Sequence, residues 1–345
     1  MFDDSFTGSL SDTRPNWIIA ITRDVRLSSR KESPTGHARS TTYLARVGRM
    51  FSIEEFIIAV FCCVDDLLKE MTQGQPIREK GFAPALADSE VMTMEIVAEY
   101  QGIDADQAIW QYFRRHWLTL FPGLSSRSAF VRQAANLWQY KGRLQQRLAA
   151  GLGAFVDGVH LVDGIPIPLC CFNRAPRCRS FKGEAAYGYC AAKKQTYYGF
   201  HGHLLISATG VITGFTLTPE NGSEREALWD VVTSIHGLLI GDKGYLSSSL
   251  QQELRSEGIT LETALRSNMH DTRNPVKVKQ LMRVRRLIET VIGQLVERFS
   301  IEKIWARDLW HLTSRLNRKL LAHTVCRWLN RHSPNPLQFE QLVAD

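Results

Sequence analysis

The chain has 345 residues, of which 44% are hydrophobic, and this is enough for two or three domains with buried cores. A formal net charge of +7 favours a polyanionic partner. Seven cysteines, few for this length and odd in number, argue against a disulfide framework. Four acidic residues interrupt the apolar run at 51–68, which excludes a transmembrane span there, and we expect a cytoplasmic protein.

The first 49 residues differ from the rest of the chain. They are rich in Ser, Thr, Arg and Gly, and their one apolar cluster lies at residues 17–21. We expect residues 1–49 to be a mostly disordered extension. Two alternatives stay open for it: a basic arm that binds the polyanionic partner, or translation that begins at Met50.

Residues 50–151 show helical periodicity and predict an all-helical N-terminal domain. Helices are expected near 51–68, from Asp88 to about Tyr100, at 105–117 and at 126–150. The last of these carries a set of basic residues that is either a contact surface for the partner or a solvated face: Arg127, Arg132, Lys141, Arg143 and Arg147.

The next segment brings the first acidic residue with a distinctive setting. Residues 160–162 are a short apolar strand that ends at Asp163, followed by Gly164. Residues 197–206 and 211–217 predict a hairpin around a turn at 208–210. Alternation places His201 and His203 on one face of the first hairpin strand, and His203 is a candidate for active-site support. Four cysteines nearby fit no paired metal-binding spacing, so we expect no zinc site: Cys170, Cys171, Cys178 and Cys190.

Two further carboxylates follow. Residues 238–241 form an apolar strand that ends at Asp242, and Gly244 marks a turn. Residues 283–296 have apolar side chains at helical spacing and carry Glu289 at their centre. Helices at 223–234 and 247–257 and a strand at 259–264 are also expected. Three carboxylates brought together can bind two Mg²⁺ ions, the arrangement that cleaves phosphodiesters.

These motifs resemble a known family. LVDGIPIPLC around Asp163, YGYCAAKKQTYYGFHGHLLIS, GDKGY around Asp242 and RRLIET around Glu289 are similar, in this order, to the DDE transposases of bacterial insertion sequences, most of all to the IS982 family. The resemblance covers about residue 50 to the end of the chain. One signature departs from related transposases, since Arg285 and Glu289 fit it but Met282 and Val296 stand where a Tyr and a Lys are usual.

The resemblance implies an α/β fold with an RNase H-like catalytic core, a mixed five-stranded sheet with helices, at 152–299. A C-terminal helical segment at 300–345 would pack on it. The implied activity is cleavage and strand transfer at the terminal inverted repeats of an insertion sequence, with Asp163, Asp242 and Glu289 as catalytic residues and ligands of two Mg²⁺ ions, for which Mn²⁺ can substitute. The implied partners are double-stranded DNA, at element ends and target, and further copies of the chain in a homodimer or higher oligomer.

Basic residues cluster before the Glu289 helix and predict a DNA contact. The candidates are Arg266, Lys277, Lys279, Arg283, Arg285 and Arg286, together with Lys193 and Lys194, which follow Cys190. Arg285, one turn before Glu289, either pairs with it or binds a phosphate. The C-terminal helix, expected at 309–331, would direct its basic side toward DNA or solvent, with Arg315, Arg318, Lys319, Arg327 and Arg331.

Two alternatives to a transposase remain from the sequence. One is an RNase H-like metal-dependent nuclease that cuts DNA without strand transfer. The other is a catalytically inactive DNA-binding protein derived from a transposase, although all three acidic residues are present.

Overall fold

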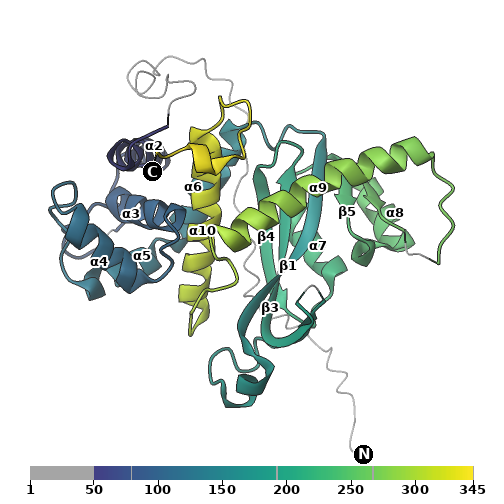
Figure 1. Cartoon of the computed structure of the whole chain (residues 1–345), viewed down its shortest axis with the longest axis horizontal. Helices are drawn as coiled ribbons and strands as arrows, with labels where there is room; N and C mark the ends of the chain where they lie inside the picture. Colours follow the sequence, from purple (N-terminus) through teal and green to yellow (C-terminus); the bar gives the residue numbers. More distant parts are fainter. Residues whose placement is uncertain (1–49, 79, 192, 266–267, 345) are drawn as a thin grey trace, which may run out of the picture.

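The structure is a computed structural model that describes residues 50–78, 80–191, 193–265 and 268–344. The expectations for residues 1–49 and for Arg266 lie outside this range. Helices come first along the described chain, a mixed sheet follows, and two long helices end it (Figure 1). The first helices are α2 (Ile53–Thr72), α3 (Asp88–Tyr100), α4 (Asp106–His116), α5 (Arg127–Asn136) and α6 (Trp138–Gly151).

The helix expected at 126–150 is two helices in the structure. α5 ends at Asn136 and α6 begins at Trp138, with Leu137 as the residue between them. The break exposes the carbonyl of Ala134 to side-chain donors, and Lys141 Nζ (2.9 Å) and Ser314 Oγ (3.1 Å) both donate to it.

A mixed sheet forms the second part of the fold. β1 (Val159–Cys171), β3 (Gln195–Ser207) and β4 (Ile212–Pro219) are antiparallel neighbours, while β5 (Gly237–Gly241) and β6 (Ile259–Thr263) run parallel to β1 in the order β4-β3-β1-β5-β6. The expectation of five strands is wrong, because in the described chain the sheet has a sixth strand, β2 (Ala186–Cys190). β2 and β4 pair with successive stretches of the same edge of β3.

β1 is much longer than expected. It was expected to end at Asp163, before Gly164, yet the strand continues through Pro166 and Pro168 to Cys171. β5 pairs with β1 only as far as Leu161, so beyond that point this edge of β1 is free. Proline is tolerated on an edge because its missing N–H is not needed by a neighbouring strand. Asp163 therefore lies inside a strand rather than at its end.

The two faces of the sheet pack against different helices. On β1, Leu161 and Ile165 join a buried cluster with side chains of α9 (Pro275–Glu297) and α10 (Leu309–Leu329). Val162, of opposite alternation, joins a second cluster with α7 (Glu224–Val231) and α8 (Ser248–Ser256). α9 crosses the first face in Figure 1, and we call this the α9 face of the sheet.

α10 is buried along most of its length between α3, α5 and α6, and the same buried cluster continues from these helices to the α9 face of the sheet. The division into domains at 151 and 299 stays a prediction. No helix in the described ranges is long and apolar enough to cross a membrane.

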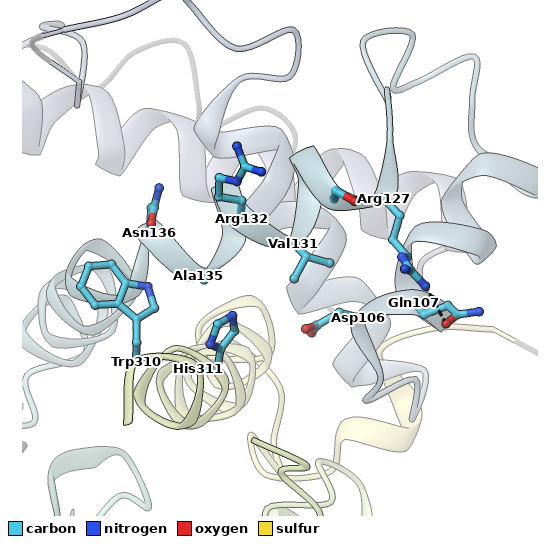
Figure 2. A pocket seen from close by; sticks show the side chains of 10 residues that line it. Asp106, Gln107, Arg127, Val131, Arg132, Ala135, Asn136, Trp310 and His311 are labelled. Atoms are coloured by element: carbon cyan, nitrogen blue, oxygen red, sulfur yellow. Dashed lines mark hydrogen bonds between the residues drawn. The ribbon is translucent and has the colours of Figure 1, made fainter. Parts of the chain in front are cut away.

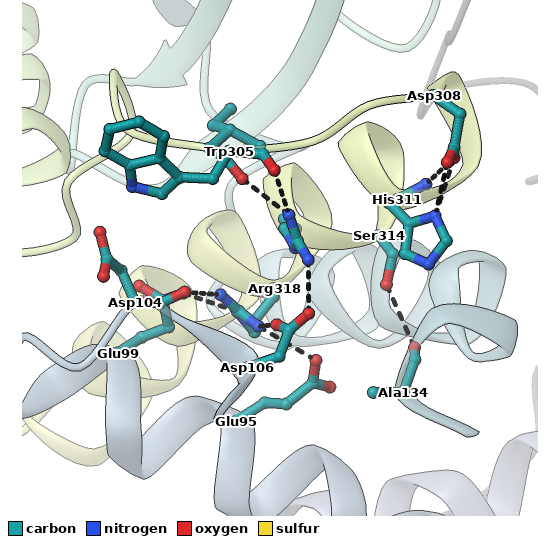
Figure 3. Close-up of polar contacts among 12 residues, drawn as sticks. Glu95, Glu99, Asp104, Asp106, Ala134, Trp305, Asp308, His311, Ser314 and Arg318 are labelled. Carbon is teal, nitrogen blue, oxygen red and sulfur yellow. Dashed lines mark hydrogen bonds and ion pairs between the residues drawn. The ribbon is translucent and has the colours of Figure 1, made fainter. Parts of the chain in front are cut away.

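The contact between α3 and α10 contains buried ion pairs (Figure 3). Arg318 donates to Glu99 (2.6 Å) and Asp106 (2.8 Å), and Lys319 Nζ donates to Glu99 (2.8 Å). Lys141 on α6 donates to Glu95 (2.8 Å) in the same way. The expectation that Lys141, Arg318 and Lys319 face DNA or solvent is wrong, since the side chain of each is at most 1% exposed. It is also wrong for Arg327, which is buried in α10.

Candidate active site

Three carboxylates from three elements share one guanidinium. Asp163 lies on β1, Asp242 directly follows β5, and Glu289 lies near the middle of α9. Arg285 approaches all three, with nitrogen–oxygen distances of 3.2 Å to Asp163, 3.5 Å to Asp242 and 3.8 Å to Glu289.

Strand pairing and alternation explain why the carboxylates meet. Leu161 pairs with Ile240 in the parallel ladder, so Asp163 and Asp242, two residues further along each strand, are neighbours. Both share the alternation of residues that pack on the α9 face of the sheet. α9 crosses that face, and Arg285 and Glu289, four residues apart, lie on one side of it. β5 and α9 were predicted at these places.

The electrostatics of the site favour a cation near Asp163. Burial raises the pKa of Asp163, the Gly164 N–H (2.9 Å) and Arg285 oppose this shift, and the negative charge of Asp242 adds to it. Glu289 is more than half exposed, so the site opens to solvent on the side of α9. Nε of Arg285 is buried without a hydrogen-bond partner among the described residues.

The donor chemistry fits a divalent metal ion. Three carboxylates offer hard oxygen ligands, which Mg²⁺ requires. In this conformation, however, no three His, Cys, Asp or Glu side chains of the described chain lie close enough to hold one ion. Arg285 supplies the positive charge instead, because it is the common partner of the three carboxylates.

Comparison with known proteins bears on this site. Residues 153–309 match the family model of the transposase DDE domain. The match includes all three carboxylates and supports a transposase. No curated protein matches the chain. A cryo-EM structure of the piggyBac transposase synaptic complex with hairpin DNA is similar over 83% of this chain and 76% of that chain, with 9% identity and a TM-score of 0.41, a likeness too distant to carry an argument.

His203 and His201 lie on the opposite face of the sheet. His203 pairs in register with Gly164, not with Asp163, and shares the alternation of Leu205, which packs in the α7 and α8 cluster. Its Nε2 lies 3.0 Å from Thr218 Oγ1, and burial, with the neighbouring His201, lowers its pKa to about 3. His203 is therefore a neutral, buried histidine behind the carboxylates.

The prediction for this pair missed a polar cluster around His201. Its ring lies over Gly164, where a Cβ atom would come within 2.2 Å of Nε2. Glu220 accepts hydrogen bonds from Tyr197 and, at 3.3 Å, from His201 Nδ1. Burial lowers the pKa of His201, but Glu220 and Glu224 outweigh it, so the pKa is raised. Only the cross-strand register could have revealed this cluster.

The basic candidates divide by their partners. Lys277 pairs with Glu262 (2.9 Å), which also pairs with Arg273 (2.8 Å), a basic residue that was not among the candidates, and Lys193 pairs with Glu302. The sequence could not show that Glu262, on β6, neutralises part of this cluster. The remaining candidates are exposed and have no ion pair with a described acidic residue: Lys194, Lys279, Arg283 and Arg286.

A groove of about 560 Å³ lies between α4, α5 and α10 (Figure 2). In the sequence, α4 and α5 precede the strands of the sheet and α10 follows them. Arg127, Arg132 and Trp310 line it, and Arg127 donates to Gln107 (2.9 Å). It shares no residue with the carboxylate site. Two of the basic residues predicted on 126–150 therefore face a groove, while Arg147 pairs with Glu70.

Proposed function

We propose that the chain is a DDE transposase of the IS982 type, which binds the terminal inverted repeats of an insertion sequence and catalyses cleavage and strand transfer of DNA. The observation that carries this proposal is the convergence of Asp163, Asp242 and Glu289 on Arg285. Like charges a few ångströms apart repel, so these carboxylates need a cation between them, and unlike the buried ion pairs of α3 and α10 this group is open to solvent at Glu289, where a metal ion can reach it.

An RNase H-like core is part of the proposal. Three antiparallel strands followed by two that join in parallel, in the order β4-β3-β1-β5-β6, support it. So does the origin of the carboxylates, two from adjacent central strands and one from the helix that crosses them.

Asp163, Asp242 and Glu289 would hold two Mg²⁺ ions, or Mn²⁺ in their place. When bound, the metal supplies the charge that activates the attacking oxygen and stabilises the leaving 3′ oxygen. The chain itself positions the phosphate. Asp163 is held rigidly by β1 and its bond from Gly164, while Glu289, exposed on α9, can adjust to the substrate. Arg285 is suited to bind a phosphate of the strand bidentately.

The path of the DNA follows from the exposed charges. Lys279, Arg283 and Arg286 lie on α9 in the turns before Glu289 and carry no described ion pair. A duplex bound along this half of the helix would bring its backbone to the carboxylates. Transposition requires that both ends of the element be bound in one complex, so we expect a homodimer or higher oligomer on DNA.

The test is a cleavage and joining assay on DNA that carries the element ends. Asp163→Asn, Asp242→Asn and Glu289→Gln should each abolish cleavage and leave end binding intact, because each removes a ligand charge and keeps the shape. Glu297→Gln is the matched control, an exposed acid on the same helix. Cleavage without joining by the wild-type protein would favour the nuclease. End binding without cleavage would favour the inactive descendant.

A further inference from the structure

The paired ends of β1 and β3 extend beyond the rest of the sheet, at the bottom of Figure 1. We define the β-arm as residues 169–191 and 193–198, which include the end of β1, a short 3₁₀ helix (Phe172–Arg177), β2 and the start of β3. No catalytic role in the proposed function uses this part of the chain.

The β-arm presents aromatic rings to solvent. Phe172 is 54% exposed, Tyr187 48% and Tyr189 60%. The Phe172 and Tyr187 rings lie 5.6 Å apart, and Tyr189 follows on the same side of β2. An apolar patch of this kind on a folded surface is typical of a binding site.

The same surface is strongly basic. The β-arm has six Lys and Arg residues and one acidic residue, Glu184. Four of the basic side chains are exposed and form no ion pair with a described acidic residue: Arg174, Arg177, Arg179 and Lys182. Charge of one sign beside exposed rings is the chemistry that binds single-stranded nucleic acid, where phosphates meet the cations and bases stack on the rings.

The β-arm is a folded platform. Phe181 is buried against Phe200, with ring centroids 5.4 Å apart, and the Tyr198 hydroxyl donates to the Phe181 carbonyl (2.8 Å). Lys193 also ties the turn before β3 to Glu302, after α9. Rings held on a rigid support lose little freedom when they bind a partner.

The rings face the same way as the carboxylates. Tyr187 pairs with Tyr198, and Asp163 pairs with Leu204. Tyr198 and Leu204 are six residues apart on β3 and share its alternation, so they lie on the α9 face of the sheet about 20 Å from each other. A strand bound at the carboxylates can therefore continue to the β-arm.

We propose that the β-arm binds unpaired DNA by stacking bases on Phe172, Tyr187 and Tyr189, and so holds the strand that leaves the carboxylate site. That the strand is DNA rests on the proposed function. Stacking explains the exposed rings, whereas duplex binding would need only the cations.

The test is direct binding in EDTA by the full chain, with short fluorescent oligo(dT) and blunt random duplex as the two probes. Each stacked ring lost should weaken oligo(dT) binding roughly 5- to 150-fold. The variant Phe172→Ala with Tyr189→Ala should therefore lose most oligo(dT) affinity and change duplex affinity less than about twofold. Tyr189→Phe should retain affinity because the ring remains. Phe82→Ala, fully exposed and outside the β-arm, is the matched control.

A charge variant separates the cations from the rings. Arg174→Gln with Arg177→Gln should flatten the log–log salt dependence of oligo(dT) binding by about 1.4, at about 0.7 per phosphate on a single strand. The aromatic variant should keep the wild-type slope.

Three results would overturn the proposal: wild-type oligo(dT) affinity in the aromatic variant, equal loss for both probes, or a changed oligomeric state with oligo(dT) binding intact. The last would make the surface a contact between copies of the chain. Because EDTA removes metal, a protein that fails the cleavage assay can still pass this one.

Discussion

Replacing Lys141 tests how much the buried ion pairs stabilise the helical part of the chain. Its ammonium group is buried and donates to Glu95 (2.8 Å), the Ala134 carbonyl (2.9 Å) and Ser314 (3.0 Å). In Lys141→Met the shape is nearly kept, but Glu95 retains only Arg318, at 3.5 Å, as a charged partner. Removing one partner of a buried pair costs about 3–5 kcal/mol, a large part of the stability of an ordinary domain.

The measurement is urea unfolding at constant pH. Lys141→Met should lower the free energy of unfolding by about 3–5 kcal/mol, and adding Glu95→Gln should restore part of it because no charge is then stranded. Arg132→Met, which removes an exposed charge from the neighbouring helix, should change it by less than about 0.5 kcal/mol. If Lys141→Met is as stable as wild type and binds duplex DNA more weakly, the lysine faces DNA and this reasoning is refuted.

Three further perturbations address other parts of the chain. Burial, with the charge of Arg327, lowers the pKa of His323 to about 3, so as the pH falls the unfolded chain binds this proton before the folded chain does. This histidine alone should lower the free energy of unfolding by about 1.4 kcal/mol per unit as the pH drops from 6 to 4, and His323→Gln should reduce the slope of acid-dependent unfolding by that amount. Arg285→Gln frees three carboxylates of their shared cation, so added Mg²⁺ should raise the melting temperature more than in wild type; an equal rise would contradict the competition. Ala at both Lys279 and Arg283 should flatten the salt dependence of duplex binding by about one to two units, and an unchanged slope would place DNA elsewhere.

The sequence predicted the elements that carry the carboxylates because their signals are local. The continuous apolar run of β5 ends at Asp242, and the helical spacing around Glu289 indicates α9 without reference to the rest of the chain. The convergence on Arg285 was less accessible, since only one of its three contacts, the one to Glu289 four residues away, is local in sequence.

The errors share a physical cause. A basic residue on an amphipathic helix looks solvent-exposed unless its partner is known, and the partner of Lys319 is Glu99, 220 residues earlier. Glu95 and Glu99, one turn apart among the mostly apolar residues 91–100 of α3, were the available signal that buried cations exist elsewhere. The length of β1 could not be predicted for a related reason. Pro166 and Pro168 are tolerated in the strand because β5 stops pairing with β1 at Leu161, and the sequence does not show where that pairing ends.

The position of α10 has a consequence for biosynthesis. α3 and α6 bury their apolar sides and charged residues against a helix encoded about two hundred residues later. At roughly 5–20 residues per second, the ribosome delivers α10 about 10–40 s after α3 has emerged. During that interval Glu95 and Glu99 have no cation from α10, and the apolar surface around them is open to solvent. The helices that start the described chain thus complete their folding only after its last long helix has been made, and chaperones have this period in which to bind them.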